Sequence, residues 1–295
     1  MKQLSAIARR AVQANDWATV SACANKILNQ DKKSPEGYFL SGLVEKAARR
    51  TKKAAAAFSQ AISLDARRYD AAIELANQYL MLLRHGEALA LLRQYESRPG
   101  NSPLYLDMAA STYSRLGLHA RAWPLYCKAN ELQPGIDMFQ ANLAACAVFL
   151  GKIEEAKAIY RGLLGRHPNH QKNHYELSRL EKAKDSSHVE QMQEILETTQ
   201  LAAEKNIFMY YAIGKELEDL ERWQEAFQYY KMAGDAVTMV TKKAGYDVGA
   251  EIELIDKIIE ICNSDWLAAG IRKTKTDKLQ KTPFLLWVFH VQARR

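Results

Sequence analysis

Three histidines stand close together in the run HPNHQKNH, at His167, His170 and His174, and histidine nitrogens can bind zinc. His167 precedes Pro168, which ends a helix, and His170 closes the loop, so only His174 falls on the next helix. Spacing of this kind is a weak ligand set. We therefore interpret the three as solvated loop histidines and predict no metal site.

Other reactive residues are equally sparse. The four cysteines, Cys23, Cys127, Cys146 and Cys262, are far apart and lack metal-type CxxC spacing, which indicates buried small residues of a reducing compartment. The chain has no Walker loop, no dinucleotide glycine fingerprint, no HExxH and no GxSxG. We expect no catalytic residues and no cofactor in this chain.

The net charge of +7 is concentrated at one end of the chain. Residues 272–295 hold seven basic residues and one acid, a net of +6, which leaves +1 for the remainder. A nucleic-acid-binding protein carries its basic residues on a folded face, so this tail argues against a nucleic-acid partner. The N-terminal MKQLSAIARR lacks a signal-peptide core, and no apolar run is long enough to span a membrane. We expect a cytoplasmic protein with no membrane partner.

The elements that would position any site follow a repeat of 34 residues, and residues 35–170 align four times without a gap. Position 8 of each block is small, position 20 is alanine, position 24 is large, and position 32 is Pro, Gly or Ala. In block order these residues are Gly42, Ala76, Ala110 and Ala144; Ala54, Ala88, Ala122 and Ala156; Phe58, Leu92, Tyr126 and Tyr160; and Ala66, Gly100, Pro134 and Pro168.

Each of these positions has a physical role. Small residues at positions 8 and 20 let two antiparallel helices approach, and the large residue at position 24 fills the gap towards the next pair. Pro or Gly at position 32 ends the second helix, and Gly117 and Gly151 mark the turn between helices. The pattern resembles the tetratricopeptide repeat. That resemblance implies an all-α fold, a right-handed superhelical solenoid of antiparallel helix pairs.

We predict six segments along the chain. A degenerate N-terminal repeat (1–34) precedes the four contiguous repeats (35–170). An irregular helix pair (171–206) and a C-terminal repeat (207–240) follow. Capping or connector helices (244–271) and a poorly ordered basic, apolar tail (272–295) end the chain, with a short β-forming run from Phe284 to Val291.

First helices of successive repeats would line a concave groove suited to an extended peptide or a helix. The candidate groove residues are Phe39, Asp70, Ile73, Asn77, Asp107, Asn142, Tyr175 and Arg179. Two alternatives stay open: Asn142 could merely pack, and Arg179 could pair with a neighbouring glutamate. The carboxylate clamp of chaperone-binding repeats is absent, because Phe39, Leu43, Glu74, Leu104 and Met108 occupy the corresponding places. We therefore expect no chaperone C-terminal tail as partner.

The second half resembles a narrower family. HPNHQKNHYELSRLEK (167–182), YAIGKELEDLERWQEAFQYYKMAG (211–234) and YDVGAEIELIDKIIEICNSDWLAA (246–269) are similar to the N-terminal region of bacterial tetratricopeptide-sulfotransferase proteins. In that family Thr-Pro, a hydrophobic strand and a P-loop-like Gly-x-Pro-Arg-Ser/Thr-Gly-Thr-Thr come next. This loop cradles the 5′-phosphate of 3′-phosphoadenylyl sulfate (PAPS), the sulfuryl donor.

Here Thr282-Pro283-Phe284 is followed by LLWVFHVQARR, and the phosphate loop is missing. A shifted reading frame can encode it, since Trp287 followed by Val288 gives Gly with any Val codon. Our hypothesis is that the last eleven or so residues are an out-of-frame reading of that loop.

Three functions therefore compete. The first is a non-catalytic scaffold that binds a protein or peptide in its groove. The second is the substrate-recruiting part of a sulfotransferase, which transfers sulfuryl from PAPS to a hydroxyl, with its catalytic domain lost by truncation or frameshift. The third is nucleic-acid binding through the basic tail. The absent catalytic motifs favour the first for this chain.

Overall fold

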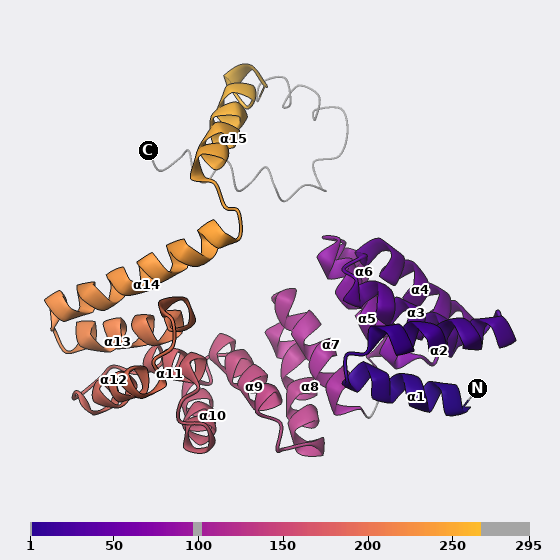
Figure 1. Ribbon diagram of the computed structural model, residues 1–295, viewed down its shortest axis with the longest axis horizontal. Coiled ribbons are helices and arrows are strands. Elements are labelled where there is room, and N and C mark those ends of the chain that lie inside the picture. Colours follow the sequence, from indigo (N-terminus) through magenta and orange to yellow (C-terminus); the bar gives the residue numbers. More distant parts are fainter. Residues whose placement is uncertain (1, 97–101, 267–295) are drawn as a thin grey trace. The chain divides into compact units, whose positions relative to one another are not determined.

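The computed structural model describes residues 2–96 and 102–266 (Figure 1). These residues form α-helices joined by short turns, with one 3-10 turn and no strand among them. The helices are α1 (Lys2–Gln13), α2 (Trp17–Gln30), α3 (Pro35–Ala47), α4 (Thr51–Leu64), α5 (Tyr69–Met81), α6 (His85–Tyr95), α7 (Pro103–Arg115), α8 (His119–Leu132), α9 (Asp137–Phe149), α10 (Ile153–Arg166), α11 (Gln171–Ser178), α12 (Ser187–Thr199), η1 (Ala203–Lys205), α13 (Ile207–Asp219), α14 (Trp223–Lys243) and α15 (Val248–Ile261).

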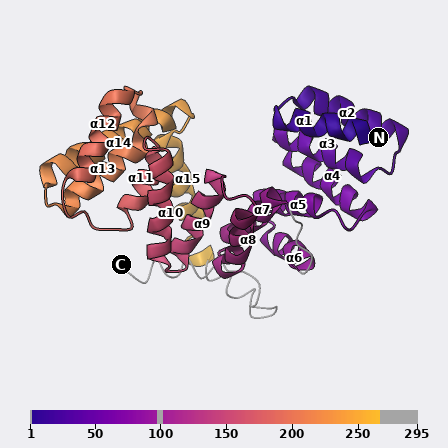
Figure 2. The same ribbon diagram turned by 90° about the horizontal axis from the view of Figure 1, so that it is seen from below.

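Helix starts reproduce the 34-residue period. The first helices α3, α5, α7, α9 and α11 begin at residues 35, 69, 103, 137 and 171, and the second helices α4, α6, α8, α10 and α12 begin at 51, 85, 119, 153 and 187. The predicted all-α array of antiparallel helix pairs is confirmed. Each helix packs on its neighbours in the sequence from α1 to α6 and from α7 to α11, and first helices also touch, α5 with α7 and α7 with α9 (Figures 1 and 2).

The register changes after α12. Strict spacing would start the next first helix at residue 205, but η1 occupies residues 203–205 and α13 begins at Ile207. The helix α11 is also short, with 8 residues where α3, α5, α7 and α9 have 13. The division of the chain into six segments stays a prediction.

The turn inside each helix pair has left-handed backbone at one repeat position. Asn15, Arg49, Leu83, Gly117 and Gly151 are each 34 residues apart, and all have positive φ between 56° and 74°. Only two of the five are glycine, the residue that adopts this conformation without a steric penalty. The sequence pattern therefore located the turn from its two glycines, while the backbone imposes the same conformation on all five residues.

Close helix crossings explain the small residues at position 8. A Cβ built on Gly42 would lie 2.5 Å from the Phe58 ring, and one on Gly214 would lie 3.0 Å from the Tyr230 ring. In both pairs the large residue at position 24 covers the small residue of the same repeat. Position 24 was expected to fill the gap towards the next pair; within these two repeats it also fills the gap inside its own pair.

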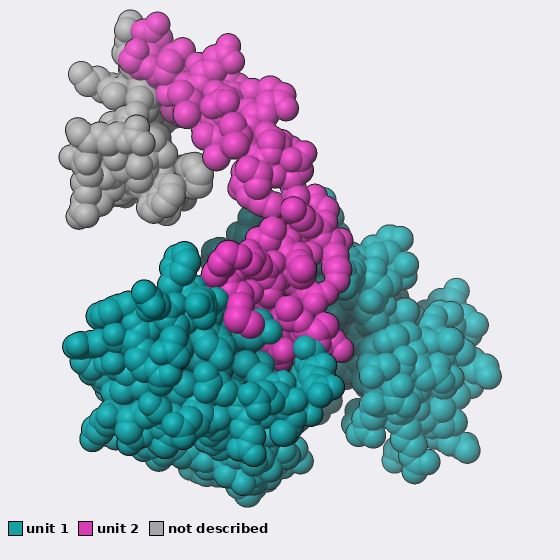
Figure 3. Space-filling view, turned by 60° about the vertical axis from the view of Figure 1, so that its left-hand side comes forward, with its two compact units in different colours: residues 1–201, 208–230 teal, residues 202–207, 231–295 magenta. Residues whose placement is uncertain are grey.

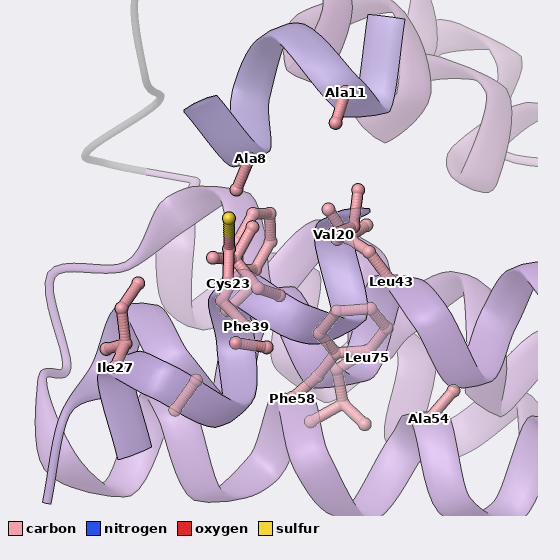
Figure 4. Close-up of a cluster of buried hydrophobic side chains, with 14 of the residues drawn as sticks. Ala8, Ala11, Val20, Cys23, Ile27, Phe39, Leu43, Ala54, Phe58 and Leu75 are labelled. Carbon is pink, nitrogen blue, oxygen red and sulfur yellow. The ribbon is translucent and has the colours of Figure 1, made fainter. Parts of the chain in front are cut away.

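Buried apolar side chains from consecutive helices form the core. In the N-terminal part, Val20 and Cys23 of α2 meet Phe39 of α3, Phe58 of α4 and Leu75 of α5 (Figure 4). Further clusters follow along the array, so each pair buries its apolar face on the next, as expected for stacked repeats.

The chain divides into two compact units, coloured separately in Figure 3. Unit 1 comprises residues 1–201 and 208–230, and unit 2 comprises residues 202–207 and 231–295. In unit 2 the side chains of Lys243 and Glu204 form an ion pair, and Asp247 caps α15 by accepting a hydrogen bond from the Gly249 N–H. No residue of α15 is buried, although Ile252, Ile255 and Ile259 follow one stripe of it.

Two sequence expectations fall outside the described residues. They are the poorly ordered tail at 272–295, with its β-forming run, and the last part of the connector, 267–271. Within the described part, no helix combines the length and the apolar character needed to cross a membrane.

Candidate functional site

The first helices of unit 1 enclose a hollow of about 760 Å³, which we call the first-helix groove. Its residues come from α3, the α3–α4 turn, α4, α5, α7 and α9. They are Lys46, Arg49, Thr51, Asn77, Gln78, Met81, Leu104, Asp107, Met108, Ser111, Arg115, Met138 and Asn142. Because these helices start 34 residues apart, residues at equal repeat positions lie along one face. The groove therefore extends across three successive repeats and into the fourth.

Three of the predicted groove residues line this hollow: Asn77 of α5, Asp107 of α7 and Asn142 of α9. Asn142 Nδ2 lies 3.1 Å and 3.0 Å from the two carboxylate oxygens of Asp107, to which it donates. Asn77 Nδ2 donates to the Ile73 carbonyl at 3.1 Å, and Asn77 Oδ1 accepts from the Thr112 hydroxyl at 3.3 Å. Thus Asn142 does not merely pack; it links the third repeat to the fourth.

Of the described residues that line the first-helix groove, Asp107 is the one acid, and it is buried. Only 4% of its surface is exposed, and the amide of Asn142 is the one side chain among the described residues that hydrogen-bonds its carboxylate. Burial raises the pKa of Asp107 to about 6, and the hydrogen bond from Asn142 offsets part of that effect. A carboxylate has room for about four hydrogen bonds, so Asp107 retains acceptor capacity towards the groove.

Three other predicted residues are buried or bound to other side chains of the protein. Phe39 lies buried beneath the Arg68 guanidinium, whose carbon is 4.5 Å from the ring centroid. Asp70 binds Arg68 through both carboxylate oxygens at 2.7 Å. Ile73 is 1% exposed. Positions 2 and 5 of the first two blocks therefore serve contacts between repeats rather than an open surface.

Of the last two predicted residues, Tyr175 lies on α11 and Arg179 is its C-cap, and neither lines the groove as defined above. The Tyr175 ring packs 5.5 Å from Phe208 and 6.4 Å from Tyr211 of α13. Arg179 lies over the Tyr175 ring at 5.3 Å and contacts Glu176 at 3.4 Å. The alternative in which Arg179 pairs with a neighbouring glutamate is the arrangement found.

The candidate set from the sequence left out the exposed apolar and the basic residues of the groove. Met81 ends α5, while Leu104 and Met138 stand at the second position of α7 and α9, and 62%, 47% and 53% of their surfaces are exposed. Arg49 and Arg115 line the edge of the groove. The first-helix positions expected to face the groove were 2, 5, 9 and 12 of each repeat. Met81 and Arg115 occupy position 13 and Arg49 occupies position 15 in the turn, so all three lie just beyond those positions.

A smaller hollow of about 340 Å³ continues the groove between α9, α10 and α11. It shares Met138 and Asn142 with the first-helix groove. His167 and His170 line it, and His167 Nε2 lies 2.7 Å from Asp137. Hydrogen bonding from Arg166 lowers the pKa of Asp137 and keeps this carboxylate charged.

His174 lies on the next helix as predicted, but its interpretation as a solvated residue is wrong. His174 lies on α11, fully buried, with Nε2 2.6 Å from the Pro168 carbonyl and Nδ1 2.8 Å from His188 Nε2. His188 Nδ1 in turn lies 2.6 Å from Glu216. The His174 ring joins α11 to α12, and His188 continues the connection to α13. Burial of His174 lowers its pKa. Within the described residues, no three His, Cys, Asp or Glu side chains gather to hold a metal ion.

No family model matches the chain, and no curated protein matches it. Among solved structures, the human IFIT1 dimer with m7Gppp-AAAA has a TM-score of 0.54 at 17% identity, over 76% of this chain and 54% of that one. YrrB, a tetratricopeptide protein with an unusual peptide-binding site, has a TM-score of 0.49 at 16% identity, over 70% of this chain and 97% of that one. TTC0263, a thermophilic tetratricopeptide protein of Thermus thermophilus, has a TM-score of 0.49 at 15% identity, over 61% of this chain and 97% of that one.

Identities this low show the fold alone. The 34-residue helix period, the positive-φ turn at each repeat and the small-large packing inside pairs define the class of protein. The chain therefore has a helical-repeat fold of the tetratricopeptide type.

Proposed function

We propose that this scaffold binds a protein or peptide segment in the first-helix groove. The observation that carries the proposal is Asp107, a buried carboxylate that opens on the groove with one amide partner. Burying an ionisable group disfavours folding unless the group is paired, so such residues gather at binding and catalytic sites. A ligand N–H would supply the missing donor.

The surroundings of Asp107 suit a peptide. Met81, Leu104 and Met138 expose apolar surface around it, and methionine side chains adapt to ligands of varied shape. The amides of Asn77 and Asn142 line the groove and already bond within the protein, but an amide has two donor hydrogens and two acceptor lone pairs, so each keeps capacity for a peptide backbone. Apolar anchors would supply affinity and the polar groups would set the register of the ligand.

The test starts from peptides selected on the purified chain from a random displayed library. Calorimetry then compares wild type with the double variant Asn77→Ala, Asn142→Ala. We expect at least a tenfold loss of affinity, about 1.4 kcal/mol, because two backbone-pairing amides are removed. The matched control is Gln60→Ala, Gln94→Ala, which removes two exposed amides from α4 and α6. Equal losses in both double variants, or selected peptides that bind outside the groove, would refute the proposal.

A second candidate function is the recruitment of an acceptor substrate to a sulfotransferase. The observation in its favour is the resemblance of residues 211–234 and 246–269 to the tetratricopeptide-sulfotransferase family. The nucleotide sequence around codon 284 tests this candidate. A frame that encodes Pro-Arg-Ser/Thr-Gly supports it, and the absence of such a frame refutes it. Titration of the chain with PAPS should give no heat, since no donor loop is encoded in this frame.

A further inference from the structure

Two arginines at the edge of the first-helix groove have no acidic partner among the described residues. Arg49 lies in the turn after α3, next to the C-cap Ala48, and Arg115 is the last residue of α7, where it donates to the Met81 sulfur at 3.7 Å. Other arginines of the array, such as Arg68 and Arg121, bind carboxylates. An unpaired guanidinium is a ready two-pronged donor for carboxylate or phosphate oxygens.

The net charge of the first-helix groove also favours an anionic ligand. Its residues include three cations, Lys46, Arg49 and Arg115, and one acid, Asp107, a net of +2. Lys46 is held by Glu74, a buried residue of α5, at 2.7 Å. The positive charge left for a ligand is therefore on Arg49 and Arg115. Both stand where first helices end, so they share one edge of the groove, while Asp107 lies buried below.

Apolar surface lies beside this basic edge. Met81 is in contact with Arg115, and Leu104 and Met138 continue the exposed apolar floor. No aromatic ring lines this groove among the described residues. Single-stranded nucleic acids are held by base stacking on aromatic rings as well as by cations, so this lining favours a peptide.

We infer that the groove takes an extended peptide in which acidic side chains alternate with flexible apolar ones. The acids pair with Arg49 and Arg115, and the apolar side chains lie on Met81, Leu104 and Met138. This inference rests on the proposed function and names the chemical class of its ligand. Phosphoserine presents the same oxygen chemistry as Asp or Glu, so the experiment must separate the two sources.

The experiment uses short synthetic peptides, acetylated and amidated, in which Leu alternates with Glu, Gln, Lys or phosphoserine. Binding to the full chain is followed by calorimetry and by the methyl signals of Met81 and Met138 in NMR spectra. We expect the Leu-Glu peptide to bind about tenfold more tightly than the Leu-Gln peptide, since two charge-assisted pairs form. In the double variant Arg49→Gln, Arg115→Gln this preference should vanish.

The matched control is Arg10→Gln, Arg93→Gln, which removes two exposed arginines of α1 and α6 that also lack acidic partners among the described residues. It should leave the preference intact. If the phosphoserine peptide binds and the Leu-Glu peptide does not, the site recognises phosphopeptides rather than acidic side chains. That result would overturn the inference.

Four further results would overturn the inference. Equal binding of the Leu-Glu and Leu-Gln peptides would leave the proposed function standing and remove only its ligand class. Tighter binding of the Leu-Lys peptide would place the ligand on Asp107 instead. Tighter binding of a single-stranded oligoadenylate than of any peptide would show that the groove serves nucleic acid, and failure of every peptide to shift the methionine signals would remove the proposed function as well.

Discussion

The buried carboxylate of Asp107 has a direct consequence for stability. Its native pKa of about 6 lies above the ordinary value of 3.8, so the folded state binds the proton more tightly than the unfolded state. The contribution of Asp107 to stability is therefore fully present below about pH 4 and is lost as the pH rises through 6.

Asp107→Asn removes this titration. We expect the variant to be more stable than wild type at pH 7.5, by about 2 to 3 kcal/mol, and equally stable at pH 4. Urea unfolding at the two pH values measures the difference. Asp137→Asn is the control of opposite sign, because hydrogen bonding to Arg166 lowers the pKa of Asp137 and its contribution is present above the unfolded pKa. Equal effects of Asp107→Asn at both pH values would contradict the assignment.

The turn residues give a second prediction at the residue scale. Leu83 has a φ of 59° and an exposed side chain, and Gly117, one repeat later, has a φ of 74° with open space where a Cβ would stand. Leu83→Gly should raise the free energy of unfolding by about 0.5 to 1 kcal/mol, and Gly117→Ala should lower it by a similar amount. Denaturant titration measures both. Destabilisation by Leu83→Gly would show that its side chain contributes more than its backbone strain removes.

At the scale of helix pairs, the distance between two crossing helices depends on one small residue. Gly42 leaves room for the Phe58 ring at a distance where a Cβ would overlap it, and Gly214 leaves slightly more room for Tyr230. The three alanines at position 8 of the other regular repeats are fully buried. Helix pairs of this array therefore differ in how closely they approach, and the glycine pairs tolerate the least additional volume.

Gly42→Ala should destabilise the chain by about 1 to 3 kcal/mol, because it overpacks a rigid contact. Gly214→Ala should cost less, since its Cβ would meet Tyr230 at 3.0 Å rather than 2.5 Å. The double variant Gly42→Ala, Phe58→Leu should recover part of the loss, as the smaller side chain makes room. If the loss of unfolding free energy in the double variant equals or exceeds the summed losses of the two single variants, the steric explanation fails.

At the scale of the whole molecule, stacked repeats contact mainly their neighbours, so a local defect should stay local. Gly42→Ala should therefore speed amide hydrogen exchange in α1 to α6 and leave α10 to α13 close to wild type. Exchange measured by mass spectrometry on peptide fragments distinguishes these regions. Uniform loss of protection along α1 to α13 would show that unit 1 unfolds as one cooperative block instead.

Much of the fold could be predicted from the residues, because the features involved are local and periodic. Position 8, position 20 and position 24 recur every 34 residues, and each sets a contact between two helices that are adjacent in the chain. The turn position was located for the same reason. His174 was misjudged because it is buried only when α12 packs on α11 and brings His188 to its ring, and His188 in turn contacts Glu216 of α13.

The peptide-binding role of the candidate residues stays a prediction. Asn77, Asp107 and Asn142 line the first-helix groove, whereas Phe39 and Ile73 are buried. Helical periodicity predicts which face of a first helix is directed towards the groove, but it does not predict how much of that face the next repeat buries. The exposure of Met81, and of Arg49 and Arg115, which have no acidic partner among the described residues, depends on this coverage.

The sequence by itself determined the class of fold, the length of the repeat and the place of the turns inside pairs, because these follow from spacing along one chain. The tertiary structure decided which side chains of the first helices remain open to a ligand. The physical reason is that burial depends on the packing of one helix pair on the next, which brings together residues about 34 positions apart, such as Asp107 and Asn142. That packing turned a row of candidate residues into a groove with a buried acid and a basic edge.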